Sequence, residues 1–318
     1  MASKWLVTGG AGFIGLHLVR TLLSMGDRVV ILDNFDTGRR GRIPGDADLI
    51  VSDISDAIAV QGAMRGVDGC FHLAAIASVG RSVDEWYPSH QTNVGGTVAV
   101  FDAATKLSGL PVVYASSAAV LGVQEKVAAT EMAPTSPLSP YGVDKLGCEL
   151  HAKVARDILH ARLLGLRFFN VYGPGQRPDS GYAGVITSFA HRALAQSPII
   201  INGDGLQVRD FVHVDDVVAH LISAMDVLRN GDAVPPVLNV CTGRSTTISE
   251  LASMVVSITG SASQVVHGIE RPGDIQYSLG DPRLCQLTLG VAASRSLQSH
   301  LASTIDFIHE HMDQGDDQ

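Results

Sequence analysis

A tyrosine and a lysine stand four residues apart, at Tyr141 and Lys145. This spacing places both side chains on one face of a helix, and a neighbouring ammonium favours the phenolate form of a tyrosine, which can then take a proton from a hydroxyl. Alone, such a pair is more often a solvated helix face. Upstream, however, the β-branched run 112–115 ends in Ser116 and Ser117, where a sheet displays side chains to its ligand. We expect one serine to share the reacting oxygen and the other to cap the turn.

A glycine-rich turn follows the apolar run 5–8 and opens a helix that begins at Leu16. Glycines in this context permit a tight turn and bring backbone N–H groups close to a pyrophosphate at the helix N-terminus. The pattern predicts a dinucleotide site, with a flexible glycine turn as the less favoured alternative. The residues of this turn expected at the cofactor are Gly9, Gly12, Phe13, Ile14 and Gly15.

Two acidic residues follow the next two predicted strands. Asp33 can accept hydrogen bonds from a ribose 2′-hydroxyl and would repel a 2′-phosphate, so NAD is favoured over NADP. Arg39 and Arg40 could instead hold that phosphate. Asp53 and Ile54 are placed to meet the adenine, although an ordinary strand-end turn explains them equally well.

Short β-branched runs alternate with helical patterns, which predicts an α/β fold with a doubly wound, Rossmann-like parallel sheet. The predicted strands are 5–8, 28–32, 49–51, 70–74, 112–115, 164–169 and 237–241, and helical spacing marks 16–25 and 94–107. Glycine and proline crowd the chain after Asn170, which indicates a smaller α/β lobe. We expect an NAD-binding domain of residues 1–170 and 208–243, and a nucleotide-sugar-binding lobe of residues 171–207 and 244–318.

The composition excludes several classes of protein. With 318 residues, 46% of them hydrophobic and 17% charged, the chain can bury a large core. Its net charge of −9 argues against nucleic-acid binding. The four cysteines lack CxxC spacing, no apolar run reaches membrane-spanning length, and the histidines show no metal-ligand pattern. We expect a cytoplasmic protein without a metal or a membrane partner.

Four motifs together carry a resemblance to a known family. They are TGGAGFIG at 8–15, HLAA at 72–75, Ser-Ser-Ala at 116–118 and YxxxK at 141–145. The chain resembles the extended short-chain dehydrogenase/reductases of the NAD-dependent epimerase/dehydratase family, and more narrowly the nucleotide-sugar 4-epimerases, from about residue 5 to residue 307.

The resemblance implies a role for each matching position. Tyr141 matches the base, Lys145 the ribose-binding lysine and Ser117 the catalytic serine. The implied NAD contacts are Gly9, Gly12, Phe13, Ile14, Gly15, Asp33, Asn34, Asp53, Ile54, Leu73, Ala74, Ala75, Asn93, Ser116, Tyr141, Lys145 and Phe168. The implied substrate contacts are Ser117, Asn170, Arg209, Arg271, Asp274 and Ser278.

Four of these contacts have specific expected partners. Arg209, in VRDFVHVDD, and Arg271 are expected on the UDP diphosphate, and Asp274 on a ribose hydroxyl. Seven positions after Arg271, Ser278 is expected to border the sugar's C2 substituent and to leave room for an acetamido group. Tyr277 is the alternative at that boundary.

The implied activity is C4 epimerisation of UDP-glucose and UDP-galactose, extended to UDP-N-acetylhexosamines, through transient oxidation by bound NAD. Elimination of water or carbon dioxide from the oxidised sugar is disfavoured, because the residues that follow Ser117 are Ala118 and Ala119 and not an acid. The alternatives are another NAD-dependent nucleotide-sugar epimerase or dehydratase, such as a UDP-glucuronate 4-epimerase, and a non-catalytic NAD-binding regulator. A homodimer through the helices of 93–107 and 141–155 is also implied.

Overall fold

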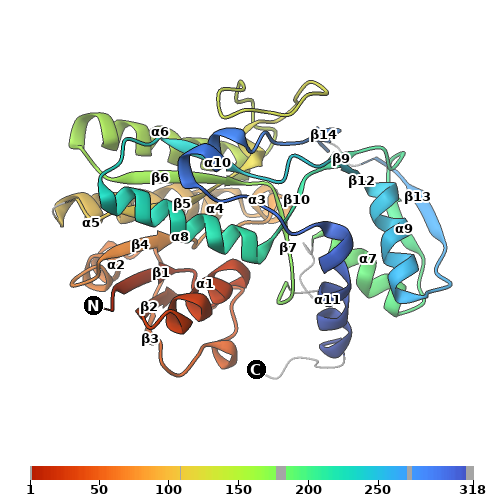
Figure 1. Ribbon diagram of the computed structural model, residues 1–318, viewed down its shortest axis with the longest axis horizontal. Coiled ribbons are helices and arrows are strands. Elements are labelled where there is room, and N and C mark those ends of the chain that lie inside the picture. Colours follow the sequence, from red (N-terminus) through yellow and green to blue (C-terminus); the bar gives the residue numbers. More distant parts are fainter. Residues whose placement is uncertain (1, 108, 177–183, 271–273, 313–318) are drawn as a thin grey trace.

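The computed structural model describes the whole chain except residues 1, 108, 177–183, 271–273 and 313–318. Its centre is a seven-stranded sheet in which every neighbouring pair is parallel, in the order β11-β6-β5-β4-β1-β2-β3 (Figure 1). The strands are β1 (Lys4–Thr8), β2 (Arg28–Asp33), β3 (Asp48–Val51), β4 (Gly69–His72), β5 (Val112–Ser117), β6 (Leu163–Phe168) and β11 (Val237–Val240). The expected doubly wound α/β fold is confirmed.

The direction in which strands are added reverses beside β1. From β1 the chain adds β2 and β3 on one side, and it then returns to add β4, β5 and β6 on the other. Ligands of doubly wound sheets bind at the carboxyl ends of the strands at such a reversal. The fold therefore directs attention to the ends of β1, β2 and β4.

The sheet is buried on both faces because successive strand residues point to opposite sides. Val7 and Ile31 belong to one apolar core, whereas Leu6 and Leu32 belong to the other. The first core is covered by α1 (Phe13–Ser24), α8 (Val214–Asn230) and α10 (Arg283–Leu289), and the second by α2 (Ala57–Ala63), α5 (Thr97–Lys106) and α6 (Pro140–Leu159).

Short helices and turns connect these layers. They are the 3-10 turn η1 (Arg40–Arg42), α3 (Val79–Asp84), α4 (Trp86–His90), the π-helical turn η2 (Gln91–Gly96) and the 3-10 turn η3 (Ala118–Val120). The expected helix 94–107 is thus preceded by a π-helical turn. Thr97 donates a hydrogen bond to the Asn93 carbonyl, and two glycines follow Val94, so the regular helical pattern is disturbed there.

A smaller group of elements lies beside the large sheet, to the right in Figure 1, around a third apolar core. It comprises α7 (Val185–Leu194), α9 (Ile248–Thr259) and α11 (Leu297–Glu310) with short strands. The strand pairs are β8 (Ile199–Asn202) with β13 (Val265–Gly268), β7 (Asn170–Tyr172) with β10 (Phe211–His213), and β9 (Val208–Arg209) with β12 (Thr246–Thr247) and β14 (Tyr277–Ser278). The proposed division into domains stays a prediction.

Most predicted elements lie where the sequence places them, with ends shifted by one to three residues. The strand expected at 70–74 ends at His72, and the strand expected at 164–169 ends at Phe168. The run 237–241 does join the large sheet, beside β6. In the part of the chain that the structure describes, no helix is both long and apolar enough to cross a membrane.

Candidate active site

The glycine turn between β1 and α1 has no space for a side chain at Gly9 or Gly15. Gly9 has φ +69°, and a Cβ there would lie 2.7 Å from the Ala74 nitrogen. A Cβ on Gly15 would lie 2.1 Å from the Gly9 carbonyl oxygen. Gly12 is the N-cap of α1 and offers no side-chain cap, and the first turn, which includes Phe13 and Ile14, has no acidic residue. The positive end of the helix can therefore accept an anion.

Asp33 connects this turn to the end of β2. One carboxylate oxygen accepts a hydrogen bond from the Ala11 N–H at 3.0 Å, and the other accepts from the Phe35 N–H at 2.8 Å. The side chain is largely buried. A carboxylate is thus fixed at the end of β2, beside the glycine turn, as the sequence predicts.

Asn34 and Asp53 lie beside each other at the ends of β2 and β3. The Asn34 amide donates to Asp53 at 2.7 Å, and the Ser55 N–H donates to the other Asp53 oxygen at 2.8 Å. Burial raises the pKa of Asp53, but these hydrogen bonds outweigh it and leave the pKa below its usual value. Ile54 is buried next to Gly96.

A series of linked, buried hydrogen bonds fixes the end of β4. The Leu73 N–H donates to the Thr8 carbonyl at 3.1 Å, and the Ala74 N–H reaches the Thr8 hydroxyl at 3.3 Å. That hydroxyl also pairs with His72, whose other ring nitrogen pairs with Thr97. Burial, assisted by the positive charge of Lys145, lowers the pKa of His72 to about 3. The ring is therefore neutral and positions the backbone that leads to Ala74 and Ala75.

Asn93, in η2, is completely buried. Its side-chain oxygen Oδ1 accepts from the Ile76 N–H at 2.8 Å, and its side-chain nitrogen Nδ2 donates to the Ile76 carbonyl at 3.2 Å. It therefore holds the loop after β4 in place. The expected contact of Asn93 with the cofactor stays a prediction.

The tyrosine and lysine lie in the first two turns of α6. Ser139 caps this helix, and the Tyr141 N–H donates to the hydroxyl of buried Ser82 at 3.1 Å. The Lys145 Nζ donates to the Ala115 carbonyl at 2.8 Å and lies 5.8 Å from the centre of the Tyr141 ring. The structure therefore holds an ammonium beside the phenol in a largely buried environment.

Ser117 ends β5, two residues after Ala115 and on the same face of the strand. Its hydroxyl accepts from the Ala119 N–H at 3.1 Å, so it caps the short turn η3 while remaining partly exposed. The expected turn cap is therefore Ser117 itself, the serine that the resemblance assigns to catalysis, and not its neighbour Ser116. Lys145, through its hydrogen bond to Ala115, and Ser117 therefore both lie at the carboxyl end of β5.

Ser116 points to the opposite face of β5. Its hydroxyl donates to Glu149 at 2.5 Å, and Glu149 receives two further hydrogen bonds from Arg167 at 2.8 and 2.7 Å. The side chains of Arg167 and Glu149 are 4% and 9% exposed. The Ser116 side chain thus has a structural partner, and its expected cofactor contact stays a prediction.

Strand β9 and the segment before β14 bring two of the predicted substrate residues into contact with each other. Arg209 donates to Asp274 at 2.6 Å and to the Ile275 carbonyl at 2.6 Å. Burial lowers the pKa of Arg209, and the nearby Asp274 opposes this. Arg271 lies outside the described residues.

Ser278 pairs directly with Arg209, because β14 lies parallel to β9. Tyr277 pairs with Val208 in the same register. Directly paired residues of parallel strands point to the same face, so Ser278 shares a face with Arg209 and Tyr277 does not. Phe168 is largely buried at the end of β6, and Asn170, which begins β7, is partly exposed.

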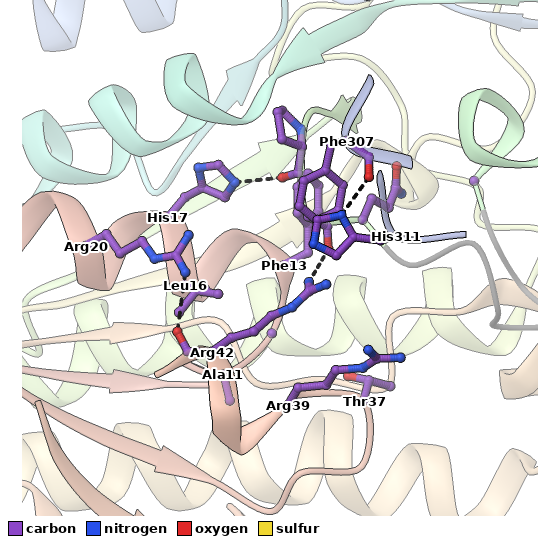
Figure 2. Close-up of a pocket in the computed structure, with 15 residues that line it drawn as sticks. Ala11, Phe13, Leu16, His17, Arg20, Thr37, Arg39, Arg42, Phe307 and His311 are labelled. Atoms are coloured by element: carbon purple, nitrogen blue, oxygen red, sulfur yellow. Dashed lines mark hydrogen bonds between the residues drawn. The ribbon is translucent and has the colours of Figure 1, made fainter. Parts of the chain in front are cut away.

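A pocket of about 430 Å³ opens beside the glycine turn. It shares Gly12 and Phe13 with that turn, but neither Tyr141 nor Ser117 lines it. Figure 2 shows Arg42, from the segment after β2, pointing toward Phe307 and His311 of the C-terminal region, whereas Arg39 lies beside Thr37. The Arg42 guanidinium lies 5.3 Å from the centre of the Phe307 ring, and that ring stacks on His311 at 4.1 Å. This pocket therefore adjoins the glycine turn and does not include the predicted catalytic residues.

Sequence reasoning missed several residues that support this site. Glu149 is detectable, since it continues the spacing of Tyr141 and Lys145 by four residues on the same helix face. No local pattern marks Ser82 or Arg167, because their contacts join segments that are distant in the chain. Among the described residues, no three His, Cys, Asp or Glu side chains gather where they could hold a metal ion.

Comparisons with known proteins identify the family to which this chain belongs. The model of the NAD dependent epimerase/dehydratase family matches residues 5–241. A curated relative, UDP-glucose 4-epimerase of Mycolicibacterium smegmatis, is 33% identical over 311 residues, which are 96% of this chain and 98% of the relative.

Two solved structures are similar over nearly the whole chain. UDP-glucose 4-epimerase of Thermotoga maritima with UDP-glucose has a TM-score of 0.92 at 32% identity, covering 98% of this chain and 100% of that one. UDP-N-acetylglucosamine 4-epimerase of Methanobrevibacter ruminantium with UDP-N-acetylmuramic acid has a TM-score of 0.91 at 31% identity, covering 98% and 99%.

Proposed function

Because the chain belongs to the NAD-dependent epimerase/dehydratase family, we propose that it interconverts the C4 epimers of UDP-hexoses, with UDP-glucose and UDP-galactose as the principal pair. The observation that carries this proposal is the buried Tyr141–Lys145 pair held against the end of β5, where Ser117 lies. A non-catalytic NAD-binding regulator does not require these three residues together.

The residues around the β1 end fit NAD. The glycine turn leaves backbone and an uncapped helix N-terminus for the pyrophosphate, and the Asp33 carboxylate lies where the ribose 2′-hydroxyl is expected. Asn34, Asp53 and Ile54 lie at the neighbouring strand ends, toward the expected adenine. NAD, when bound, accepts a hydride from C4 and later returns it.

The chain's own residues move the proton. Tyr141 takes the proton of the C4 hydroxyl and later gives it back, and Lys145 lies beside the phenol, with its Nζ 5.8 Å from the centre of the ring. Ser117 hydrogen-bonds the C4 oxygen through both steps. The sugar must turn about its diphosphate linkage between oxidation and reduction, so that reduction occurs on the opposite face.

The residues after Ser117 favour epimerisation over elimination. Ala118 and Ala119 form η3 and supply no acid or base beside the reacting carbons. The 4-keto sugar then lacks a group that would remove a neighbouring proton, and reduction is the remaining route. A dehydratase or a UDP-glucuronate 4-epimerase is the second candidate, and only membership of the same family supports it.

The smaller lobe holds the nucleotide and sets the width of the sugar pocket. Arg209 and Arg271 contact the diphosphate, and Asp274 both orients Arg209 and accepts from a ribose hydroxyl. Ser278 supplies the small side chain at C2, an assignment supported by its register beside Arg209. The similarity to a UDP-N-acetylglucosamine 4-epimerase supports activity on N-acetylated sugars.

The protein forms a homodimer through α5 and α6, the helices of the segments 93–107 and 141–155. The apolar side chains of Val143, Leu150, Val154 and Ile158 are each more than half exposed on one face of α6. Light scattering should give twice the 33.5 kDa chain mass. Changing both Leu150 and Val154 to Glu should give monomers, whereas Leu287→Glu, exposed on α10, should not. A monomeric native protein would contradict the dimer.

The protein works in the cytoplasm. All four cysteines are buried free thiols, which suits a reducing compartment. Fractionation of cells that make the protein tests this, and recovery in an extracellular or periplasmic fraction would contradict it.

The activity is tested by incubating the purified protein with UDP-glucose, UDP-N-acetylglucosamine and UDP-glucuronate without added cofactor and separating the C4 epimers. We expect epimers of the first two, and NAD should appear when the protein is denatured. Tyr141→Phe should retain NAD but lose epimerisation by several orders of magnitude, whereas Tyr87→Phe, at an exposed tyrosine, should be nearly unaffected. Near-normal turnover of the Tyr141→Phe variant would show that Tyr141 is not the catalytic base.

A further inference from the structure

An ion pair joins two segments that flank the proposed cofactor site. Arg81, in α3, donates to both carboxylate oxygens of Asp36, which follows β2; one of the two hydrogen bonds measures 3.0 Å. The residues are 45 positions apart in the chain. Such bidentate ion pairs fix the relative orientation of the two side chains more strongly than a single hydrogen bond does.

The position of this pair follows from the strand order. Asp36 comes after β2 and Arg81 comes after β4, and these two strands are the neighbours of β1. The pair therefore joins the two segments that follow the strands on either side of β1, from which the glycine turn begins. Neighbouring strands lie about 4.8 Å apart, so β2 and β4 lie about 9.6 Å apart. A long arginine side chain is suited to bridge such a gap.

The loop that presents Asp36 is held in one conformation. The Asn34 side chain accepts from the Asp36 N–H at 3.0 Å, and Asp33 accepts from the Phe35 N–H. Phe35 itself has φ 60°, a left-handed conformation that a bulky residue adopts at a cost. The strained turn keeps Asp36 close to Asp33, the predicted ribose-binding residue.

The Arg81 guanidinium has a second carboxylate partner within its own helix region. The Arg81 Nε donates to Glu85 at 2.8 Å, one helical turn later, which orients the side chain along α3. The next residue, Ser82, is completely buried and accepts from the Tyr141 N–H. The same short helix thus contacts both the cofactor side and the catalytic helix.

We propose that the Arg81–Asp36 ion pair is a clasp that closes over bound NAD and slows its release. This inference rests on the NAD site of the proposed function. An epimerase that regenerates NAD in every turnover gains from slow release, since loss of the cofactor between oxidation and reduction would leave the keto sugar stranded.

The test measures the release of NAD. Protein loaded with radiolabelled NAD is chased with excess unlabelled NAD, and the bound label is followed with time. We expect Asp36→Asn and Arg81→Gln each to release NAD about fivefold faster, as for loss of one well-oriented surface ion pair. The double variant should be no faster than the faster single variant, because the two changes break one interaction. Higher salt should speed release from the native protein more than from the variants.

Two matched controls separate the clasp from general effects. Glu85→Gln removes the other partner of Arg81 but leaves the Asp36 contact, and Asp102→Asn removes an exposed ion pair on α5. Both should release NAD within twofold of the native rate. Thermal unfolding of each variant checks that it is folded.

Three results would overturn the clasp. Fast release by Arg81→Gln alone would mean that the guanidinium acts on the cofactor phosphates directly. Native rates in both single variants, or additive effects in the double variant, would mean that the pair does not control release. A native protein that takes up no NAD would contradict the proposed function as well, so the two failures are distinguishable.

Discussion

Replacing Glu149 with Ala should destabilise the protein strongly, because it breaks a buried ion pair beneath the catalytic strand. The Arg167 side chain is 4% exposed and would keep its charge without its carboxylate partner. Three hydrogen bonds end on Glu149, two from Arg167 and one from Ser116. Removing one partner of a buried pair costs about 3–5 kcal/mol, and the loss of three acceptor contacts at about 1–1.5 kcal/mol each gives a similar figure.

The assay is urea unfolding followed by circular dichroism, with NAD at one saturating concentration throughout, since bound ligand adds to stability. The double variant Glu149→Leu with Arg167→Met removes both charges and should recover more than half of the loss. Asp102→Ala, which breaks the exposed pair with Lys106, should cost less than about 1 kcal/mol.

The reasoning fails if Glu149→Ala lies within about 1 kcal/mol of the native protein, or if the double variant is as unstable as the single one. In folded Glu149→Gln we also expect kcat to fall while KM changes little. Glu149 lies one helical turn beyond Lys145, so its loss loosens the helix that holds the reacting groups without removing a substrate contact.

Three further results are expected. Asp33→Ala should narrow the preference for NAD over NADP by about fivefold, since a carboxylate near a 2′-phosphate costs about 1 kcal/mol at 4 Å in a water-like medium; an unchanged ratio of affinities would assign the discrimination to Arg39 or Arg40. Ser278→Tyr should lower kcat/KM for UDP-N-acetylglucosamine by roughly tenfold or more while sparing UDP-glucose, from overpacking at C2; equal losses would place that boundary elsewhere. The unfolding free energy should fall as pH drops from 6.5 toward about 3, because the unfolded chain protonates His72 and the folded one does not. The slope from this group is about 1.4 kcal/mol per pH unit, and urea titrations of His72→Gln should lack it; an identical slope would mean that His72 is not buried neutral.

The sequence predicted those parts of the site whose signal is local. The glycine turn, Asp33, Tyr141 and Lys145 each lie within a few residues of a strand end or helix start, and the alternation of strands and helices predicted the sheet that carries them. The side chains of Ser117 and Ser116 could not be assigned to faces from composition alone. The structure separates them through strand alternation, with Ser117 beside the Lys145 contact and Ser116 in the ion pair of Glu149.

The contacts that the sequence could not predict are those between distant segments. Arg209 and Asp274 were expected as separate contacts to phosphate and ribose, yet they form one ion pair across 65 positions. Arg81 meets Asp36 only because β2 and β4 flank β1. Such pairs depend on strand order and register, and no short-range spacing encodes them.

The central claim is that hydrogen leaves C4 and returns to C4 of the same sugar while Tyr141 moves only the proton. The most direct measurement follows UDP-glucose deuterated at C4, incubated with the purified protein without added NAD and analysed by mass spectrometry and NMR. The account predicts UDP-galactose that retains the deuterium at C4. UDP-galactose whose deuterium has exchanged with water, or the absence of a C4 epimer from a protein that carries NAD, would contradict it.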